Sequence, residues 1–147
     1  MLLLGIIVAL AVQYFGIFLS GNKYGLLFID IGSFIIGLFS PLALILASYG
    51  VKGINLVFRA LFIKKLTPED VKRSINVYKD LRLFAIISGW IAFMIGLIIM
   101  LANLESIVND NFGPGMAIAL VSPFYGYILA YFICLPIQRR LETALSL

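Results

Sequence analysis

Four apolar stretches constrain the fold of this chain more than any other feature. They cover residues 2–19, 26–49, 83–103 and 115–138, and each is long enough to cross about 30 Å of hydrocarbon at about 1.5 Å per helical residue. Hydrophobic residues make up 63% of the chain and charged residues 12%, whereas soluble domains are roughly 45–50% apolar. The sequence therefore predicts an all-α membrane protein, with four transmembrane helices in a single domain over residues 1–147.

The basic residues predict the orientation of these helices in the membrane. Every Lys and Arg except Lys23 lies between residues 50 and 82 or directly after the last apolar stretch. The positive-inside rule then places the segment 50–82 and both termini in the cytoplasm. The net charge of +4 follows from this topology and makes anionic lipids the natural neighbours. No basic soluble domain is present for nucleic acid, which is not an expected partner.

The segment 50–82 contains a helix start. Thr67 is placed as the N-cap, Pro68 as the first helical residue and Asp70 three residues after the cap. Apolar residues then repeat every three to four positions, at Val71, Ile75, Tyr78 and Leu81. No helix breaker follows, so the third membrane helix is predicted to extend into the cytoplasm. Its charges favour a solvated face at the headgroup level over a specific ligand site.

Small residues form stripes on the last two apolar stretches. They recur at helical spacing at Ala85, Gly89, Ala92 and Gly96, and again at Gly115, Ala119, Ser122, Gly126 and Ala130. In lipid, such residues let helix backbones approach closely. Taken alone, the stripes favour packing of helices within one chain, and they do not identify a pore.

Catalytic and metal-binding patterns are missing from the sequence. It contains no histidine and a single cysteine, Cys134, and no cluster of cysteines or carboxylates has the spacing of metal ligands. No set of nucleophile, base and orienting residue can be recognised. We therefore expect neither an enzyme, nor a metal site, nor a cofactor.

Two segments carry a family resemblance. The run "GPGMAIALVSPFYGYILA", residues 113–130, lies within a longer stretch, Ile95 to Glu142, that resembles the last two membrane spans of the MotA/TolQ/ExbB proton-channel family. The run "FIDIGSFII", residues 28–36, is similar to the Phe-x-Asp-x-x-Ser opening of the second span in the MotA branch. The resemblance implies a multi-pass protein of the bacterial inner membrane. It also implies a homopentamer around a dimer of single-span MotB/TolR/ExbD-like partners, whose membrane aspartate carries H+ or Na+.

The resemblance and the stripes together suggest site residues. Candidates for lining the ion path or the oligomer axis are Ser88, Gly89, Ala92, Gly96, Ala119, Ser122, Pro123 and Gly126. Pro136 matches a family proline near the cytoplasmic end of the fourth span and is a coupling candidate. The alternative for Pro136 is a simple bend where the helix leaves the membrane. Asp30 is interpreted as a helix cap or interfacial hydrogen-bonding residue rather than an ion carrier.

The chain also departs from the family pattern. Ser122 and Pro123 stand where the family has threonine-containing pairs, and Pro41 replaces a threonine of the second span. A proline at 123 frees the carbonyl of Ala119, which we expect to face protein or water at the oligomer axis. Only the segment 50–82 replaces the large cytoplasmic domain of flagellar members, and their early third-span proline is Ile86 here.

Two functions follow from these observations. The leading hypothesis is a channel or stator-type subunit of an ion-driven motor or energy-transducing complex. The alternative is a non-conducting pentameric scaffold, or an assembly that binds lipid, because the hydroxyl-bearing threonines are lost.

Overall fold

The computed structural model describes residues 2–19, 30–62, 66–102 and 112–146, which are helical almost throughout. The helices in chain order are α1 (Leu2–Leu19), α3 (Ile31–Phe62), α4 (Pro68–Ala102), α6 (Phe112–Tyr127), the π-helix η2 (Ile128–Cys134) and α7 (Leu135–Ser146). Three regions, Ile31–Leu61, Pro68–Ala102 and Phe112–Leu145, are long and apolar enough to cross a membrane, whereas the apolar helix at Leu4–Leu19 is shorter. The all-helical membrane fold is thus confirmed. The four spans, the pentamer and the cytoplasmic location of the segment 50–82 remain predictions.

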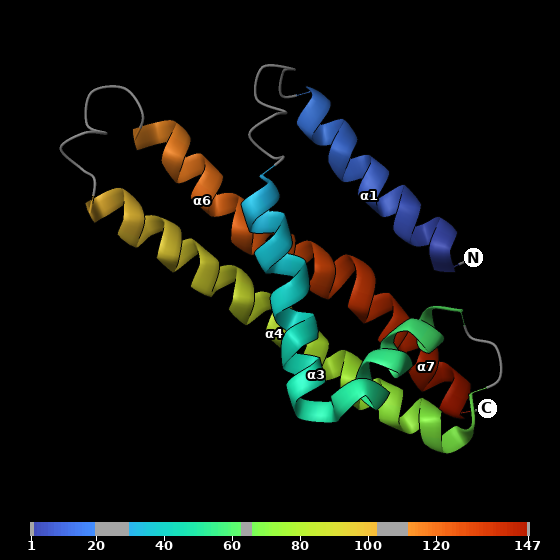
Figure 1. Cartoon of the computed structure of the whole chain (residues 1–147). Helices are drawn as coiled ribbons and strands as arrows, with labels where there is room; N and C mark the ends of the chain where they lie inside the picture. The colour runs from blue at the N-terminus through green and yellow to red at the C-terminus, as the bar shows by residue number, and fades with distance from the viewer. Residues whose placement is uncertain (1, 20–29, 63–65, 103–111, 147) are drawn as a thin grey trace.

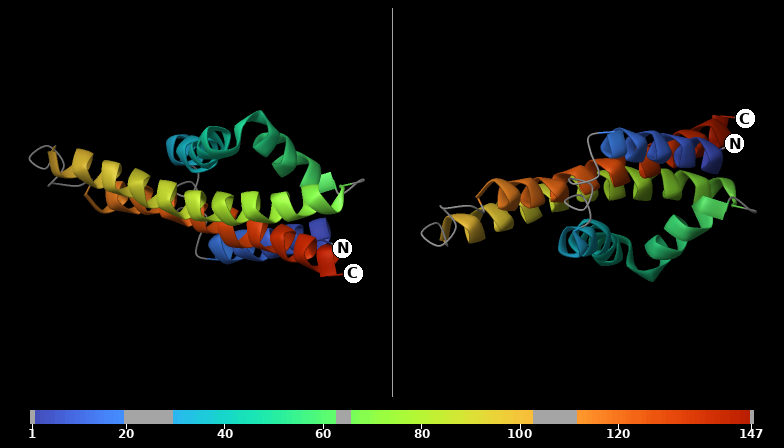
Figure 2. Two further views of the ribbon diagram at one scale, coloured as in Figure 1. Left: turned by 90° about the horizontal axis from the view of Figure 1, so that it is seen from below. Right: turned by 90° about the horizontal axis from the view of Figure 1, so that it is seen from above.

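A long helical pair forms the centre of the molecule. Helix α4 runs alongside the continuous rod made by α6, η2 and α7 (Figure 1). Helix α3 lies on one side of this pair and α1 on the other (Figure 2). The end of the pair formed by the last turns of α4 and the first turns of α6 extends beyond both flanking helices. Helices α1 and α3 therefore lie on opposite sides of this central pair.

Helix α4 begins where the sequence predicts. The side-chain oxygen of Thr67 accepts a hydrogen bond from the backbone N–H of Asp70 at 3.2 Å, and its carbonyl accepts one from Val71 at 2.9 Å. The side chain thereby caps one N–H group that the first helical turn leaves without a partner, and the carbonyl accepts the first bond of the regular helix. From Pro68 the helix continues without interruption to Ala102. The expected continuity between the charged segment and the third apolar stretch is confirmed.

Helix α3 is divided by Gly50, which the sequence analysis did not anticipate. Gly50 has φ 65° and ψ −166°, a conformation that a residue with a Cβ adopts only with strain. The chain bends there, and residues 51–62 form a second helical segment that packs on α4. Its buried residues Leu56, Val57 and Ala60 repeat at helical spacing, so the signal was present in the sequence. We call this second half of α3 the 51–62 segment.

An apolar core joins α3, mainly its 51–62 segment, to the first half of α4, to η2 and to α7. Tyr78 is almost fully buried, and its hydroxyl donates a hydrogen bond to the carbonyl of Val57 at 2.8 Å. The other buried members of this core are Ile45, Leu56, Ala60, Ile75, Val77, Leu81, Cys134, Ile137 and Leu141. This core holds the basic end of the molecule together. Along the apolar spans, by contrast, α1 and one face of α4 expose most of their large hydrophobic side chains.

Helices α4 and α6 approach most closely at two glycines. A Cβ on Gly126 would lie 2.6 Å from the carbonyl oxygen of Ala85, and one on Gly89 would lie 2.9 Å from the Cα of Pro123. Both distances are shorter than the contacts that real Cβ atoms make, and in each case the opposing atom belongs to the backbone. The small-residue stripes therefore pack helices within one chain, as the stripes alone had favoured.

Replacing Gly126 by Ala should destabilise the folded chain by about 1–3 kcal/mol, because the added methyl group forces α4 and α6 apart. Gly113→Ala, on the same helix, is the matched control, since a Cβ there meets nothing within 4 Å. The measurement is the free energy of unfolding by SDS titration in mild detergent. Equal stability of the Gly126 and Gly113 variants would contradict the close contact.

Candidate functional site

The candidate site lies where α3, α4 and α6 meet. Ser122 of α6 donates its hydroxyl hydrogen to the hydroxyl oxygen of Ser33 on α3, at 2.7 Å. Ser122 is 4% exposed and Ser33 is 6% exposed, so the pair is shielded from the surroundings of the single chain. Two hydroxyls thus satisfy one another inside an otherwise apolar contact, where an unpaired polar group would be costly.

Asp30 fixes the first turn of α3 next to this hydroxyl pair. Its carboxylate accepts a hydrogen bond from the backbone N–H of Ser33 at 2.6 Å, and its carbonyl accepts one from Phe34 at 2.9 Å. This is the geometry of an N-cap, as expected for Asp30. The cap places a carboxylate three residues before a buried hydroxyl, at the start of α3.

Aromatic packing holds α3 against α6 beside the hydroxyls. The rings of Phe34 and Tyr125 meet edge to face, with centroids 5.9 Å apart and planes at 83°. Gly37 lies beside this contact, where a Cβ would make an ordinary van der Waals contact of 3.4 Å with the Cβ of Tyr125. The contact keeps the start of α3 at the level of Ser122.

The structure brings most of the predicted site residues together. Gly89 faces Ser122 and Pro123, Gly126 faces Ala85 and Gly89, and Gly96 faces Ala119. Ser88 and Ala92 are buried on the same helix, at 5% and 7% exposure. All eight lie on the helices that form the contact within one chain, so a role at an oligomer axis stays a prediction. Pro136 is separate from them, because it lies in α7 beyond the π-helix.

The π-helix η2 lies between two prolines and was not predicted. Helix α6 continues through Pro123, the wider turns occupy Ile128–Cys134, and Pro136 follows in α7. At the end of η2 the backbone N–H of Leu135 bonds to the carbonyl of Ala130, five residues back. Such segments often occur at functional sites. The wider turns of η2 change the direction in which the side chains of α7 point relative to those of α6.

A row of exposed aromatic residues was also not predicted from the sequence. The indole N–H of Trp90 donates to the Tyr127 hydroxyl at 3.3 Å, the rings of Tyr127 and Tyr131 stack at 6.1 Å, and Arg82 lies 6.0 Å from the Tyr131 ring. Tyr127 and Tyr131 are four residues apart, and this spacing could have predicted that they are neighbours on one face of a helix. Aromatic residues beside a cation are typical of a membrane–water interface.

Helices α4 and α6 bring hydrogen-bonding groups rather than charge to the site. Residues 83–102 and 112–138 contain no Asp, Glu, Lys or Arg. Pro123 has no N–H and cannot bond to the carbonyl of Ala119. Within the part of the chain that the structure describes, no group of three or more His, Cys, Asp or Glu side chains could hold a metal ion. The site offers hydroxyls and a carbonyl to a proton or ion, but α4 and α6 supply no carrier of their own.

Removing either serine hydroxyl should weaken the contact between α3 and α6 by a modest amount. Hydrogen bonds between helices in bilayers average about 0.6 kcal/mol, and a double-mutant cycle of Ser33→Ala and Ser122→Ala should recover a coupling energy of that size. The measurement is the free energy of unfolding in detergent micelles. A cycle of Ser33→Ala with Ser88→Ala is the control, and coupling equal to that control would show that the hydroxyls do not interact.

Comparison with known proteins agrees with the resemblance in the sequence. The profile of the MotA/TolQ/ExbB proton channel family matches residues 56–146. Motility protein A of Aquifex aeolicus is 45% identical over 56 residues, which are 38% of this chain and 21% of that protein. Chemotaxis protein PomA of Vibrio alginolyticus is 33% identical over 77 residues, 52% of this chain and 30% of that protein. The uncharacterised protein YtxD of Bacillus subtilis is 38% identical over 74 residues, 50% of this chain and 26% of that protein.

The matched segments thus cover less than a third of each of these relatives. The family match begins in the 51–62 segment and ends at the last residue of α7, so it takes in both helices of the central pair and the candidate site residues on them. Since it covers more than half of the sequence, the chain belongs to the MotA/TolQ/ExbB proton channel family.

Proposed function

We propose that this chain is a channel or stator-type subunit of an ion-driven motor or energy-transducing complex in the bacterial inner membrane. Five copies surround a dimer of single-span MotB/TolR/ExbD-like partners, and a membrane aspartate of the partner carries H+ or Na+. The observation that carries the proposal is the composition of the central pair. Its apolar parts provide hydroxyls and a carbonyl but no Asp, Glu, Lys or Arg side chain. An ion relay through hydrocarbon needs such a charged side chain, which the partner's aspartate supplies.

Family membership and exposed surface both support this division of roles. Helix α4 presents an apolar face to its surroundings, formed by Ile87, Trp90, Ile91, Met94, Ile95 and Ile98. In the proposed oligomer, neighbouring copies and partner helices cover this face. The basic end faces the cytoplasm in this proposal, and Pro136 transmits movement from the site towards it.

A second candidate function is a non-conducting pentameric scaffold. It is favoured by the hydrogen bond between Ser122 and Ser33, which already uses the hydroxyl that would otherwise face an ion. The replacement of a family threonine by Pro123 also favours the scaffold, because it removes a hydroxyl. The two functions differ in one measurable property, which is ion flux in the presence of the partner.

The purified chain is expected to be a pentamer in gentle detergent and in lipid nanodiscs. Native mass spectrometry gives the stoichiometry. Cysteines at Ile91 or Ile95, which are exposed at 52% and 49%, should crosslink between copies, whereas the buried thiol of Cys134 gives little background. Cysteines at Gly89 or Gly126 are less suitable, because they would break the contact within the chain. A monomer or dimer in both environments would contradict the pentamer.

Ser122→Ala should leave the assembly intact and reduce ion flux in liposomes that contain both subunits. The substitution removes one hydroxyl from the proposed ion route. A single hydrogen bond between helices contributes about 0.6 kcal/mol on average, which is too little for its loss to dissociate the assembly. Ser122→Val should be worse, since it adds bulk to a crowded contact.

The control is a partner without its membrane aspartate, which should abolish flux in the wild type. If both Ser122 variants show the same flux as the wild type, and the partner without its aspartate shows none, the ion path does not pass Ser122. An absence of flux from every assembly would favour the scaffold.

A further inference from the structure

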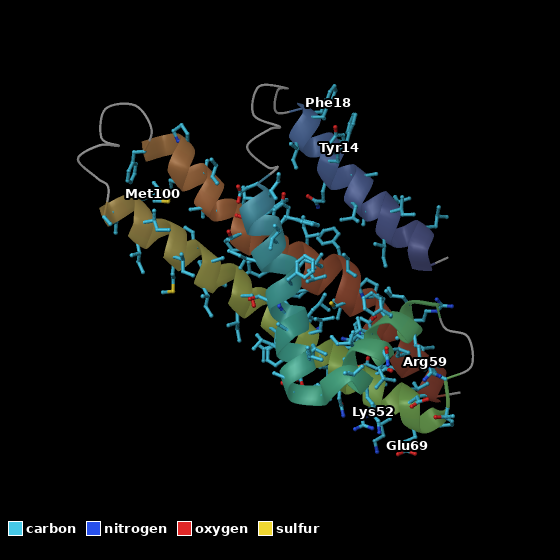
Figure 3. The ribbon with its side chains drawn as sticks, in the orientation of Figure 1. Tyr14, Phe18, Lys52, Arg59, Glu69 and Met100 are labelled. Atoms are coloured by element: carbon cyan, nitrogen blue, oxygen red, sulfur yellow. The ribbon has the colours of Figure 1, made fainter. Side chains whose placement is uncertain are left out.

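An open pocket of about 340 Å³ lies between the 51–62 segment and the first turns of α4. Its lining residues are Lys52, Asn55, Leu56, Arg59, Asp70 and Arg73. Lys52 and Arg59 project at the basic end of the molecule, close to the start of α4 (Figure 3). The volume lies at the lower end of the range of about 300–1,000 Å³ that is usual for small-molecule sites.

The charges around this pocket are unbalanced. Three cationic side chains and one carboxylate line it, and the carboxylate of Asp70 lies 3.8 Å from the guanidinium of Arg59. In the described part of the chain, neither Lys52 nor Arg73 forms an ion pair within 4.0 Å. Two positive charges therefore remain for a ligand. The amide of Asn55 adds a further hydrogen-bond donor beside them.

The helix that carries these cations also exposes apolar side chains. Val51 is 68% exposed and Phe58 is 52% exposed, next to Lys52 and Arg59 respectively. A helix with cations and exposed apolar residues side by side is typical of the boundary between headgroups and acyl chains. The apolar parts of Lys52 and Arg59 can lie along the same boundary while their charges face the headgroups.

We propose that this pocket binds a phosphate group, supplied by the headgroup of an anionic phospholipid. Arg73 and Lys52 donate hydrogen bonds to the phosphate oxygens, and Asn55 donates a third from its side-chain amide. Val51 and Phe58 contact the first part of the acyl chains. The pocket exists because Gly50 bends α3, so that cations far apart in sequence come together from two helices. For Arg73, sequence spacing alone had favoured a merely solvated face.

The test compares two variants of the full chain that remove equal charge from the same region. Lys52→Gln/Arg73→Gln empties the pocket of its unpaired cations. Lys72→Gln/Lys79→Gln removes two exposed lysines of α4 that do not line it. The probes are phosphatidylglycerol, phosphatidylcholine and inorganic phosphate, each added to protein purified in neutral detergent. Bound lipid is counted by native mass spectrometry, and thermal unfolding checks that both variants fold.

The expected result is that the pocket variant binds phosphatidylglycerol about 25-fold more weakly than the wild type, while the control variant keeps wild-type affinity. If the double variant does not fold, Lys52→Gln alone should weaken binding about fivefold on the same scale. Displacement of the lipid by millimolar phosphate would identify free phosphate as an equivalent source, and resistance to it would identify the lipid. Equal loss in both variants, equal binding of phosphatidylcholine, or no binding at all would overturn the proposal.

Discussion

The close approach of α4 and α6 is the constraint on which the rest of the structure depends. At Gly89 and Gly126 each helix meets backbone atoms of the other, with no room for a side chain. Because apolar surface gives helices little reason to associate in lipid, such backbone contact supplies the dispersion energy that holds the pair together. Everything else is arranged around the pair: α3 and α1 lie on its two sides, and the hydroxyl site forms where α3 crosses it.

The polar groups of the membrane region follow from the same constraint. A hydroxyl or freed carbonyl in hydrocarbon needs a partner within the protein, and the packing of α3 on α6 provides one where Ser122 meets Ser33. Pro123 is tolerated beside Gly89 because its ring is packed against protein rather than lipid. Beyond it, the π-helix adjusts the pitch before Pro136. The site on α6 and the coupling candidate Pro136 on α7 are therefore joined through the π-helix.

The basic end is built on a different principle. There the 51–62 segment, the first half of α4 and α7 bury a compact apolar core, while their cations remain at the surface. The bend at Gly50 turns the chain back onto α4 and so creates both this core and the pocket beside it. The phosphate-binding pocket proposed at this end would hold it at the headgroup level.

The sequence by itself determined the class, the helical content and the start of α4, because hydropathy, charge placement and the Thr67 cap act locally. It also identified the small residues and the Phe-x-Asp-x-x-Ser motif in which Asp30 caps the helix. Tertiary structure decided which surfaces those residues serve. Ser33 acquired a partner 89 residues away, the stripes became contacts within one chain, and Lys52 and Arg73 came to share a pocket. Helical spacing defines a face of each helix, but only the packing of several helices determines what that face meets.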